Sequence, residues 1–250
     1  MVATPAWPPS SLPRLFVDET LSEGRSLTLD GPQANYLAAV MRLRAGDRVK
    51  LFDDRTGEWL AELAKVGKKR VTLAVGERLR EREIVPDLWL LFAPIKRGRI
   101  DWLVEKATEL GVARLVPVLT RRTIVDRLNL DRLRAHAIEA AEQCERTALP
   151  ELAEPERLEA VLGAWTEGRT LFFADERGGE PLTAVATAPA AILIGPEGGF
   201  TDDEREAIRA LPAARAISLG PRILRADTAA LAAISLWMGA AGDWGRHAVR

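Results

Sequence analysis

The stretch "AILIGPEGGFTDDEREAIRAL", residues 191–211, joins a short apolar run to a cluster of glycines and then to a helix-like segment. Gly195, Gly198 and Gly199 fall close together at the end of that apolar run. Glycine tolerates positive φ and lets another molecule approach the backbone closely. Two interpretations therefore fit these residues, a tight strand-to-helix turn or a loop that wraps a ligand.

The segment after the glycines carries its own helix-start signal. Thr201 followed by Glu204 matches a capping box, which predicts a helix beginning near Asp202. The free N–H groups of that helix would face whatever the glycines admit. The glycine spacing matches neither a dinucleotide fingerprint nor a P-loop, so no phosphate cradle is predicted. Glu197 either accepts hydrogen bonds inside the turn or contacts the ligand.

A second unusual loop reads "GPRILRADT", residues 220–228. Ile223 and Leu224 lie between Arg222 and Arg225. A solvent loop gains nothing from two large aliphatic side chains, whereas a flat ligand such as adenine needs apolar walls. The alternative is that both side chains turn back into the core.

The second part of the chain alternates apolar runs with helical segments, which is typical of a parallel α/β sheet covered on both faces. Ligands of such sheets bind beyond the carboxyl ends of the strands, where both loops are expected to lie. Strands are expected at 88–94, 113–119, 170–174, 191–195 and 216–220, and helices at 99–111 and 130–146.

The first part of the chain is predicted to be β-rich, because short alternating runs are separated by turn signals. Five short strands with close turns favour a small barrel or closed sheet, interrupted by one helix over 32–43. The charged stretch 76–87 is expected to be a linker. The expected organisation is a proline-rich arm over 1–13, a β-barrel domain over 14–83 and an α/β domain over 84–250.

Composition excludes several classes of protein. With 47% hydrophobic and 28% charged residues among 250, the chain is ordinary for a globular protein. No apolar run is long enough to cross a bilayer, so no membrane partner is expected. Cys144 is the only cysteine, which excludes an intrachain disulfide and fits a cytoplasmic location. Two histidines exclude a multi-histidine zinc site, so no metal is expected.

The net charge of −1 hides a separation of charge along the chain. Residues 94–134 hold ten Lys and Arg against five Asp and Glu, whereas residues 139–180 hold four against eleven. A basic face of this kind attracts phosphate despite a neutral total, because phosphate responds to the local potential. The alternative is an ordinary solvated helix face.

The segment "TAALAAISLWMGAA", residues 228–241, is apolar or small nearly all round. A helix that is apolar on every face must be buried on every face. This indicates a slot shared with a second subunit, or burial within the chain itself. The expected homodimer interface includes Ala232, Ser235, Leu236 and Gly239.

With these residues in view, "LIGPEGGFTDDE" and "SLGPRILRADTAA" resemble the bacterial 16S rRNA uracil-N3 methyltransferases of the SPOUT class. The resemblance extends through "KRGRIDWLVEKATELGVARLVPVLTRRT", "IEAAEQCER" and the amino-terminal "RLFV" and "NYLAAVMRLRAGD", and so covers nearly the whole chain. Three positions depart from the family pattern: Asn35 replaces a common histidine, Asp227 replaces a usual glutamate, and Cys144 replaces a small polar residue.

The resemblance implies a fold and an activity. The fold would be a PUA-like barrel followed by a SPOUT α/β domain tied in a deep trefoil knot. The knot would bind S-adenosylmethionine (SAM), and the working unit would be a homodimer. The activity would be methylation of N3 of a uridine in 16S rRNA of the small ribosomal subunit. The glycines of 195–199 would then let the backbone wrap SAM, which carries no phosphate.

Site residues follow from the two loops and the resemblance. Arg225 is the expected stabiliser of negative charge on the uracil, its alternative role being an ion pair with Asp227 or Glu197. Glu197 is the second expected catalytic residue, as base or substrate positioner. The expected SAM contacts are Ile194, Gly195, Glu197, Gly199, Leu219, Gly220, Ile223, Leu224 and Thr228. The expected RNA contacts are Arg14, Arg42, Arg44, Lys96, Arg97, Arg121 and Arg122.

Two other functions compete with this hypothesis. A ribose 2′-O-methyltransferase of the same class would carry an Asn and a Ser in motifs that "GPRILRADT" does not contain. A non-catalytic RNA-binding protein would not need the intact glycine and "ILRADTA" loops, and a measurable SAM affinity separates it from an enzyme.

Overall fold

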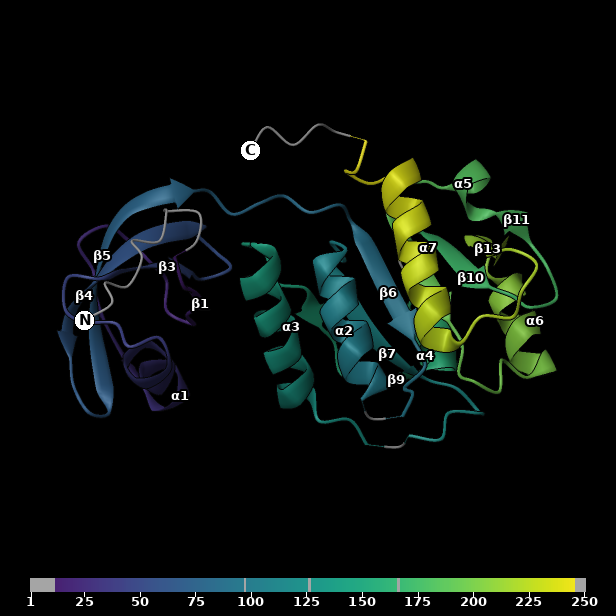
Figure 1. Ribbon diagram of the computed structural model, residues 1–250. Helices are drawn as coiled ribbons and strands as arrows, with labels where there is room; N and C mark the ends of the chain where they lie inside the picture. Colours follow the sequence, from purple (N-terminus) through teal and green to yellow (C-terminus); the bar gives the residue numbers. More distant parts are fainter. Residues whose placement is uncertain (1–11, 97, 126, 166, 246–250) are drawn as a thin grey trace. The chain divides into compact units, whose positions relative to one another are not determined.

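The computed structural model describes residues 12–96, 98–125, 127–165 and 167–245 (Figure 1). The chain divides into two compact units. The first runs up to Ile84 and also contains Ala141–Ala148, and the second comprises Val85–Ala140 and the chain from Leu149 onward. The prediction assigned all of 84–250 to one domain. This prediction was wrong for residues 141–148, which belong to the first unit and form hydrogen bonds with other segments of it. No local sequence pattern predicts these hydrogen bonds.

The first unit is built on a five-stranded sheet with the order β1-β3-β4-β5-β2. β1 pairs parallel with β3, and the other neighbours are antiparallel. The strands are β1 (Arg14–Phe16), β2 (Ser26–Asp30), β3 (Arg48–Phe52), β4 (Glu58–Val66) and β5 (Arg70–Arg80).

Alternation of side chains explains this sheet. Buried Leu27 and Leu29 alternate with exposed neighbours along β2, as a strand with one face on a core requires. The expected helix is present as α1 (Gly31–Asn35), which continues into a π-helical turn over Tyr36–Val40. The expected linker 76–87 is partly wrong, because β5 continues to Arg80 and still pairs with β4 there, although with register shifts.

A buried cluster of charges braces the first unit around Glu58. Arg14 donates from Nε to Oε1 of Glu58 and from its Nη atoms to the carbonyls of Ala141 and Arg146. Arg80 also donates to Glu58, with 3.1 Å between Nε and Oε2. Arg14 is therefore an internal brace, and the prediction that it contacts RNA is wrong.

The second unit contains a parallel sheet with the order β11-β13-β10-β12-β6-β7-β8, and β9 pairs with β7. All of its described pairings are parallel, as predicted. The strands are β6 (Leu88–Phe92), β7 (Arg114–Leu119), β8 (Glu151–Leu152), β9 (Glu156–Arg157), β10 (Thr170–Ala174), β11 (Glu180–Pro181), β12 (Ala190–Ile194) and β13 (Ala214–Ser218).

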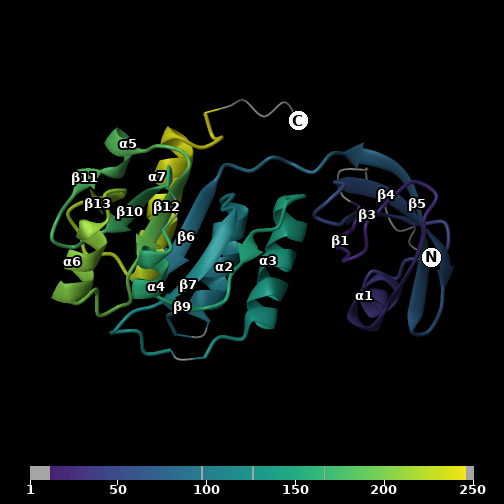
Figure 2. The ribbon, with the colours of Figure 1, turned by 180° about the vertical axis from the view of Figure 1, so that it is seen from behind.

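Helices cover both faces of this sheet, because successive side chains of a strand point to opposite faces (Figures 1 and 2). Along β6, Leu90 belongs to one core cluster and Leu91 to the other. The first cluster includes side chains of α2 (Arg99–Glu109), α3 (Leu130–Cys144), α5 (Leu182–Val185) and α7 (Ala226–Ala240). The second includes side chains of α4 (Leu158–Gly163) and α6 (Asp202–Ala210).

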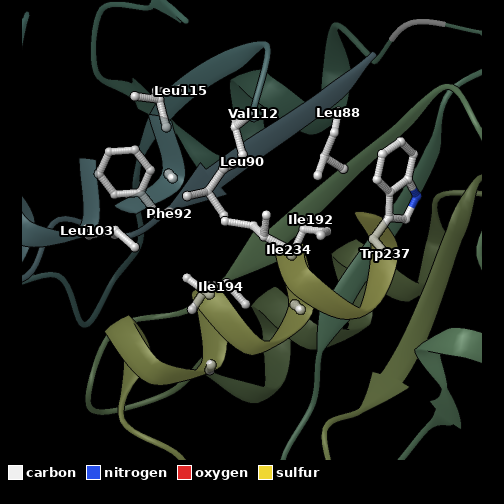
Figure 3. Close-up of a cluster of buried hydrophobic side chains, with 14 of the residues drawn as sticks. Leu88, Leu90, Phe92, Leu103, Val112, Leu115, Ile192, Ile194, Ile234 and Trp237 are labelled. Atoms are coloured by element: carbon white, nitrogen blue, oxygen red, sulfur yellow. The ribbon is translucent and has the colours of Figure 1, made fainter. Parts of the chain in front are cut away.

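The core between the sheet and α7 fixes the start of that helix. Figure 3 shows Ile234 and Trp237 of α7 among strand residues such as Leu90 and Ile192. Trp237 is fully buried, and its indole N–H donates to the carbonyl of Thr187 over 2.9 Å. This packing holds the N-terminus of α7 beside the ends of the central strands. The knot implied by the resemblance stays a prediction.

The buried cluster around Glu58 makes the stability of the protein sensitive to acid. Burial alone raises the pKa of Glu58, but hydrogen bonds from Arg14 and Arg80 outweigh it, so the net pKa lies below the ordinary value. The stabilisation is therefore complete above the ordinary glutamate pKa and is lost as the pH falls through the lowered one.

We predict that Glu58→Gln lowers the free energy of unfolding at pH 7 by about 3 kcal/mol, because it leaves buried Arg14 without its counter-charge. The difference from wild type should shrink as the pH falls below about 4, measured by urea unfolding at several pH values. Glu81→Gln is the control, because the Glu81 side chain is 81% exposed. An equal loss of unfolding free energy in both variants would contradict the stabilising role of the buried charge cluster.

Candidate functional site

The second unit contains a cavity of about 560 Å³ at the carboxyl ends of β10, β12 and β13. Its walls come from the three loops that follow these strands and from the first turn of α7. β10 lies between β12 and β13, so the three loops emerge side by side. The cavity therefore lies where parallel sheets commonly bind ligands.

Backbone rather than side chains forms one wall of this cavity. Gly199 has φ +67°, and a Cβ added there would lie 3.3 Å from Oε1 of Glu176. A Cβ at Gly195 would lie 3.0 Å from the ring of buried Phe200. Larger residues would be strained at the first position and would displace the ring at the second. Packing within the loop thus favours glycine at both positions, and their backbone lines the cavity.

Ion pairs hold the loop after β10 against the start of α6. Arg205 is 5% exposed and donates to Glu176 over 2.6 Å and to Asp175 over 3.3 Å. Burial alone raises the pKa of Asp175, but bonds from Arg209 and from the Arg177 N–H outweigh it and lower the net pKa. This wall of the cavity is therefore fixed by a charged network.

The start of α6 agrees with the sequence. Thr201 accepts a hydrogen bond from the N–H of Glu204, and the Glu204 side chain accepts from the N–H of Thr201, which completes the predicted capping box. The helix begins at Asp202, as predicted. Its first turn follows directly on the glycine loop.

The loop after β13 supplies apolar walls. Leu219 and Leu224 line the cavity and also pack against the main core of the second unit. Ile223 lines the cavity as well, but it is 91% exposed. The sequence left open whether these two aliphatic side chains wall a ligand site or turn back into the core. Leu224 turns toward the core, while Ile223 stays open to solvent at the cavity.

Arg99 forms ion pairs with two carboxylates near the cavity. No pattern in the sequence indicated this residue. Its Nη1 lies 3.9 Å from Oε1 of Glu197 and 3.7 Å from Oδ2 of Asp227. Arg225 lines the cavity and forms no ion pair with any described carboxylate. The alternative that Arg225 pairs with Glu197 or Asp227 is thus not what the structure has.

Most of the predicted SAM contacts come together around this cavity. Thr228 is the exception, because it is exposed on α7 and does not line the cavity. Its N–H bonds Oδ1 of Asp227 at the start of the helix instead. The predicted residues that do line the cavity are Ile194, Gly195, Glu197, Gly199, Leu219, Gly220, Ile223, Leu224 and Arg225.

The predicted RNA contacts in the second unit behave differently from one another. Lys96 is exposed, and Arg97 lies outside the described residues. Arg121 pairs with Asp203 at 2.5 Å. Arg122 donates from Nη1 to the carbonyl of Gly198 over 2.6 Å, so it also fixes the glycine loop.

In the first unit, Arg42 and Arg44 are both exposed in the loop before β3. Arg42 has φ 57°, and the N–H of Arg44 bonds the carboxylate of Asp47. Both side chains are open to solvent, and a role in RNA contact stays a prediction.

Two other kinds of functional feature are absent from the described residues. No helix within the described ranges is long and apolar enough to cross a membrane. Within the same ranges, no group of three or more His, Cys, Asp or Glu side chains is placed to hold a metal ion.

Family models match both parts of the chain. A model described as an RNA methyltransferase domain matches residues 82–238, and one described as an RNA methyltransferase PUA domain matches residues 29–76. Together they cover most of the chain, which belongs to this RNA methyltransferase family. Its fold is thus a PUA-like unit followed by an RNA methyltransferase unit.

Known proteins similar to this chain support the family assignment. A Ribosomal RNA small subunit methyltransferase E from Rickettsia conorii is 31% identical, over 89% of this chain and 93% of the relative. The protein of the same name from Bacillus subtilis is 27% identical, over 89% and 94%. A crystal structure of the protein of that name from Neisseria gonorrhoeae, bound to S-adenosyl methionine, has a TM-score of 0.86 and 27% identity, over 93% of this chain and 99% of the other.

Proposed function

We propose that this protein transfers a methyl group from SAM to N3 of a uridine in 16S rRNA of the small ribosomal subunit. The observation that carries the proposal is the cavity at the ends of β10, β12 and β13, with its glycine wall and its leucine walls. The names of the relatives support rRNA of the small subunit as substrate.

The cavity fits SAM on several counts. Leu219 and Leu224 offer the apolar walls that an adenine ring needs, and the backbone at Gly195 and Gly199 can approach its polar groups closely. No phosphate cradle is needed, because SAM has no phosphate. When bound, SAM supplies an electrophilic methyl group on its sulfonium.

The residues at the cavity can prepare a uracil for attack. N3 of uracil carries a proton at neutral pH, and removing it places negative charge on the ring and its two carbonyl oxygens. Arg225, which has no described counter-ion, can stabilise that charge. Arg99 pairs with Glu197 and Asp227, whereas Arg225 pairs with neither. Glu197 is the carboxylate best placed on the cavity wall to position the base or accept its proton.

The target uridine must be unstacked before its N3 can enter the cavity, which favours a single-stranded or loosely paired segment of RNA. A cytoplasmic location accompanies this proposal, because ribosomal RNA is the substrate.

We propose that the working unit is a homodimer formed through α7. One face of this helix is buried, whereas Leu236 is 38% exposed and Gly239 is also exposed. Ala226 and Ala229 of the same helix line the cavity. A second copy on the open face would therefore touch the helix that supports the site.

The direct test of the function is a map of modified nucleotides in 16S rRNA. Cells that lack this protein should lose one N3-methyluridine, and the purified protein with SAM should restore it, detected by mass spectrometry of nuclease fragments. An unchanged map in the deleted strain would contradict the proposed substrate. A ribose methyl group lost instead would indicate 2′-O chemistry.

Gly199→Val should abolish SAM binding and leave the protein folded, because the branched side chain resists positive φ and fills the glycine wall. Isothermal titration calorimetry measures the affinity and circular dichroism the fold. Gly163→Val is the control, because nothing lies within 4 Å of a Cβ there and its φ is not positive. Wild-type SAM affinity in Gly199→Val would show that SAM does not bind against this wall.

Arg225→Ala should lower the methylation rate about 10²–10³-fold, as removal of a charge-stabilising donor does. SAM affinity should change little, and Arg225→Lys should retain more activity than Arg225→Ala. Single-turnover kinetics on 16S rRNA separates the two effects. An equal fall in rate and SAM affinity would make Arg225 a cofactor clamp instead.

Leu236→Glu should give monomers with weaker SAM binding, because a charge would be stranded in the apolar contact between two copies of α7. Sedimentation velocity at micromolar concentration checks the state of both proteins. Leu79→Glu is the control, because Leu79 is 39% exposed on β5 of the first unit. A fully active wild type that sediments at 27.4 kDa would rule out the dimer.

A further inference from the structure

A groove lies beside the glycine loop and adjoins the main cavity. It consists of two depressions in the loops after β6 and β7, of about 230 Å³ and about 20 Å³. Ile95 and Val125 line both depressions, so the two adjoin. We call the combined feature the β6–β7 groove.

The floor of the β6–β7 groove is apolar and only partly covered. Ile95 and Ile100 are buried beneath it, whereas Ile124 is 80% exposed at its side. An aliphatic side chain left this open beside a depression is an exposed apolar surface against which an unstacked base can pack.

Positive charge surrounds this floor. Lys96, Arg122 and Arg127 line the groove, and none of them pairs with a carboxylate of the described chain. Among the described residues, Arg122 donates only to backbone carbonyls and has no carboxylate partner. The apolar floor and these cations together match the bases and phosphates of a nucleic acid strand.

The β6–β7 groove leads to the proposed site of methyl transfer. Pro196 and Glu197 line both the smaller depression and the main cavity. Arg99 reaches Glu197 from the start of α2, which follows directly on the loop that carries Lys96. A strand lying in the groove therefore arrives at the cavity beside Glu197.

We propose that the β6–β7 groove binds the single-stranded RNA that flanks the target uridine and delivers that nucleotide to the cavity. This inference rests on the proposed function and names the surface by which its substrate is held. Phosphates meet Lys96 and Arg127 while a neighbouring base covers Ile124.

A second copy of the chain fits this groove less well than RNA does. In a two-fold contact the same patch meets itself, so Lys96, Arg122 and Arg127 would face their own counterparts. Like charges brought together in this way oppose association. The charge pattern therefore favours a polyanion.

The test measures binding of a fluorescein-labelled oligouridine of about ten nucleotides to the full chain by anisotropy at several salt concentrations. Lys96→Ala and Arg127→Ala should each weaken binding severalfold and lower the slope of log Kd against log salt by about 0.7, the value for one phosphate contact to a single strand. Both variants should keep wild-type SAM affinity. Arg215→Ala is the control, because Arg215 is exposed on β13 away from the groove.

Ile124→Asp supplies a second variant that is safe for folding, since its side chain is already exposed. It should weaken RNA binding, whereas Ile84→Asp should not, because Ile84 is 97% exposed and does not line the groove.

The outcomes separate the groove from the proposed function. Wild-type affinity and salt slope in the groove variants, with normal methylation by the wild type, would overturn the groove and leave the function standing. Equal losses in Arg215→Ala, or a change in sedimentation without a change in RNA binding, would also overturn it. Loss of RNA binding in the groove variants alone supports it, even if the rRNA map shows a different modification.

Discussion

The structure of the site depends on one constraint, the close approach of backbone at the end of β12. Gly199 takes a positive φ beside Glu176, and Gly195 lies against the ring of Phe200, so neither position leaves free room for a side chain. The parallel order of β13, β10 and β12 brings two further loops to the same edge. The cavity is what remains between these three loops, and the packing of α7 on the sheet closes its base.

Around the cavity, some guanidinium groups form ion pairs with carboxylates, whereas others have no described carboxylate partner. Arg205 pairs with the acidic residues after β10, and Arg99 approaches Glu197 and Asp227. Arg225 also lines the cavity and has no counter-ion among the described carboxylates. In the proposed reaction, the unpaired arginine lies where negative charge develops on the uracil, and the ion-paired arginines hold the loops.

The features that follow a local pattern could be predicted from the sequence. The parallel strands, the capping box of α6 and the strand-end loops all follow from apolar periodicity and turn chemistry. Arg99 could not be found in this way, because its approach to Glu197 and Asp227 joins segments about a hundred residues apart. Arg14 looked like a surface cation, and only the position of Glu58 and of the carbonyls at Ala141 and Arg146 explains its burial.

A crystal structure of the protein grown with SAM is the most direct test of the proposed site. We expect SAM in the cavity between the loops after β10, β12 and β13, in contact with the backbone of residues 195–199 and with Leu219 and Leu224. We also expect Arg225 to stay free of Glu197 and Asp227 in that complex. SAM bound at another place on the protein, with this cavity empty, would overturn the proposed site.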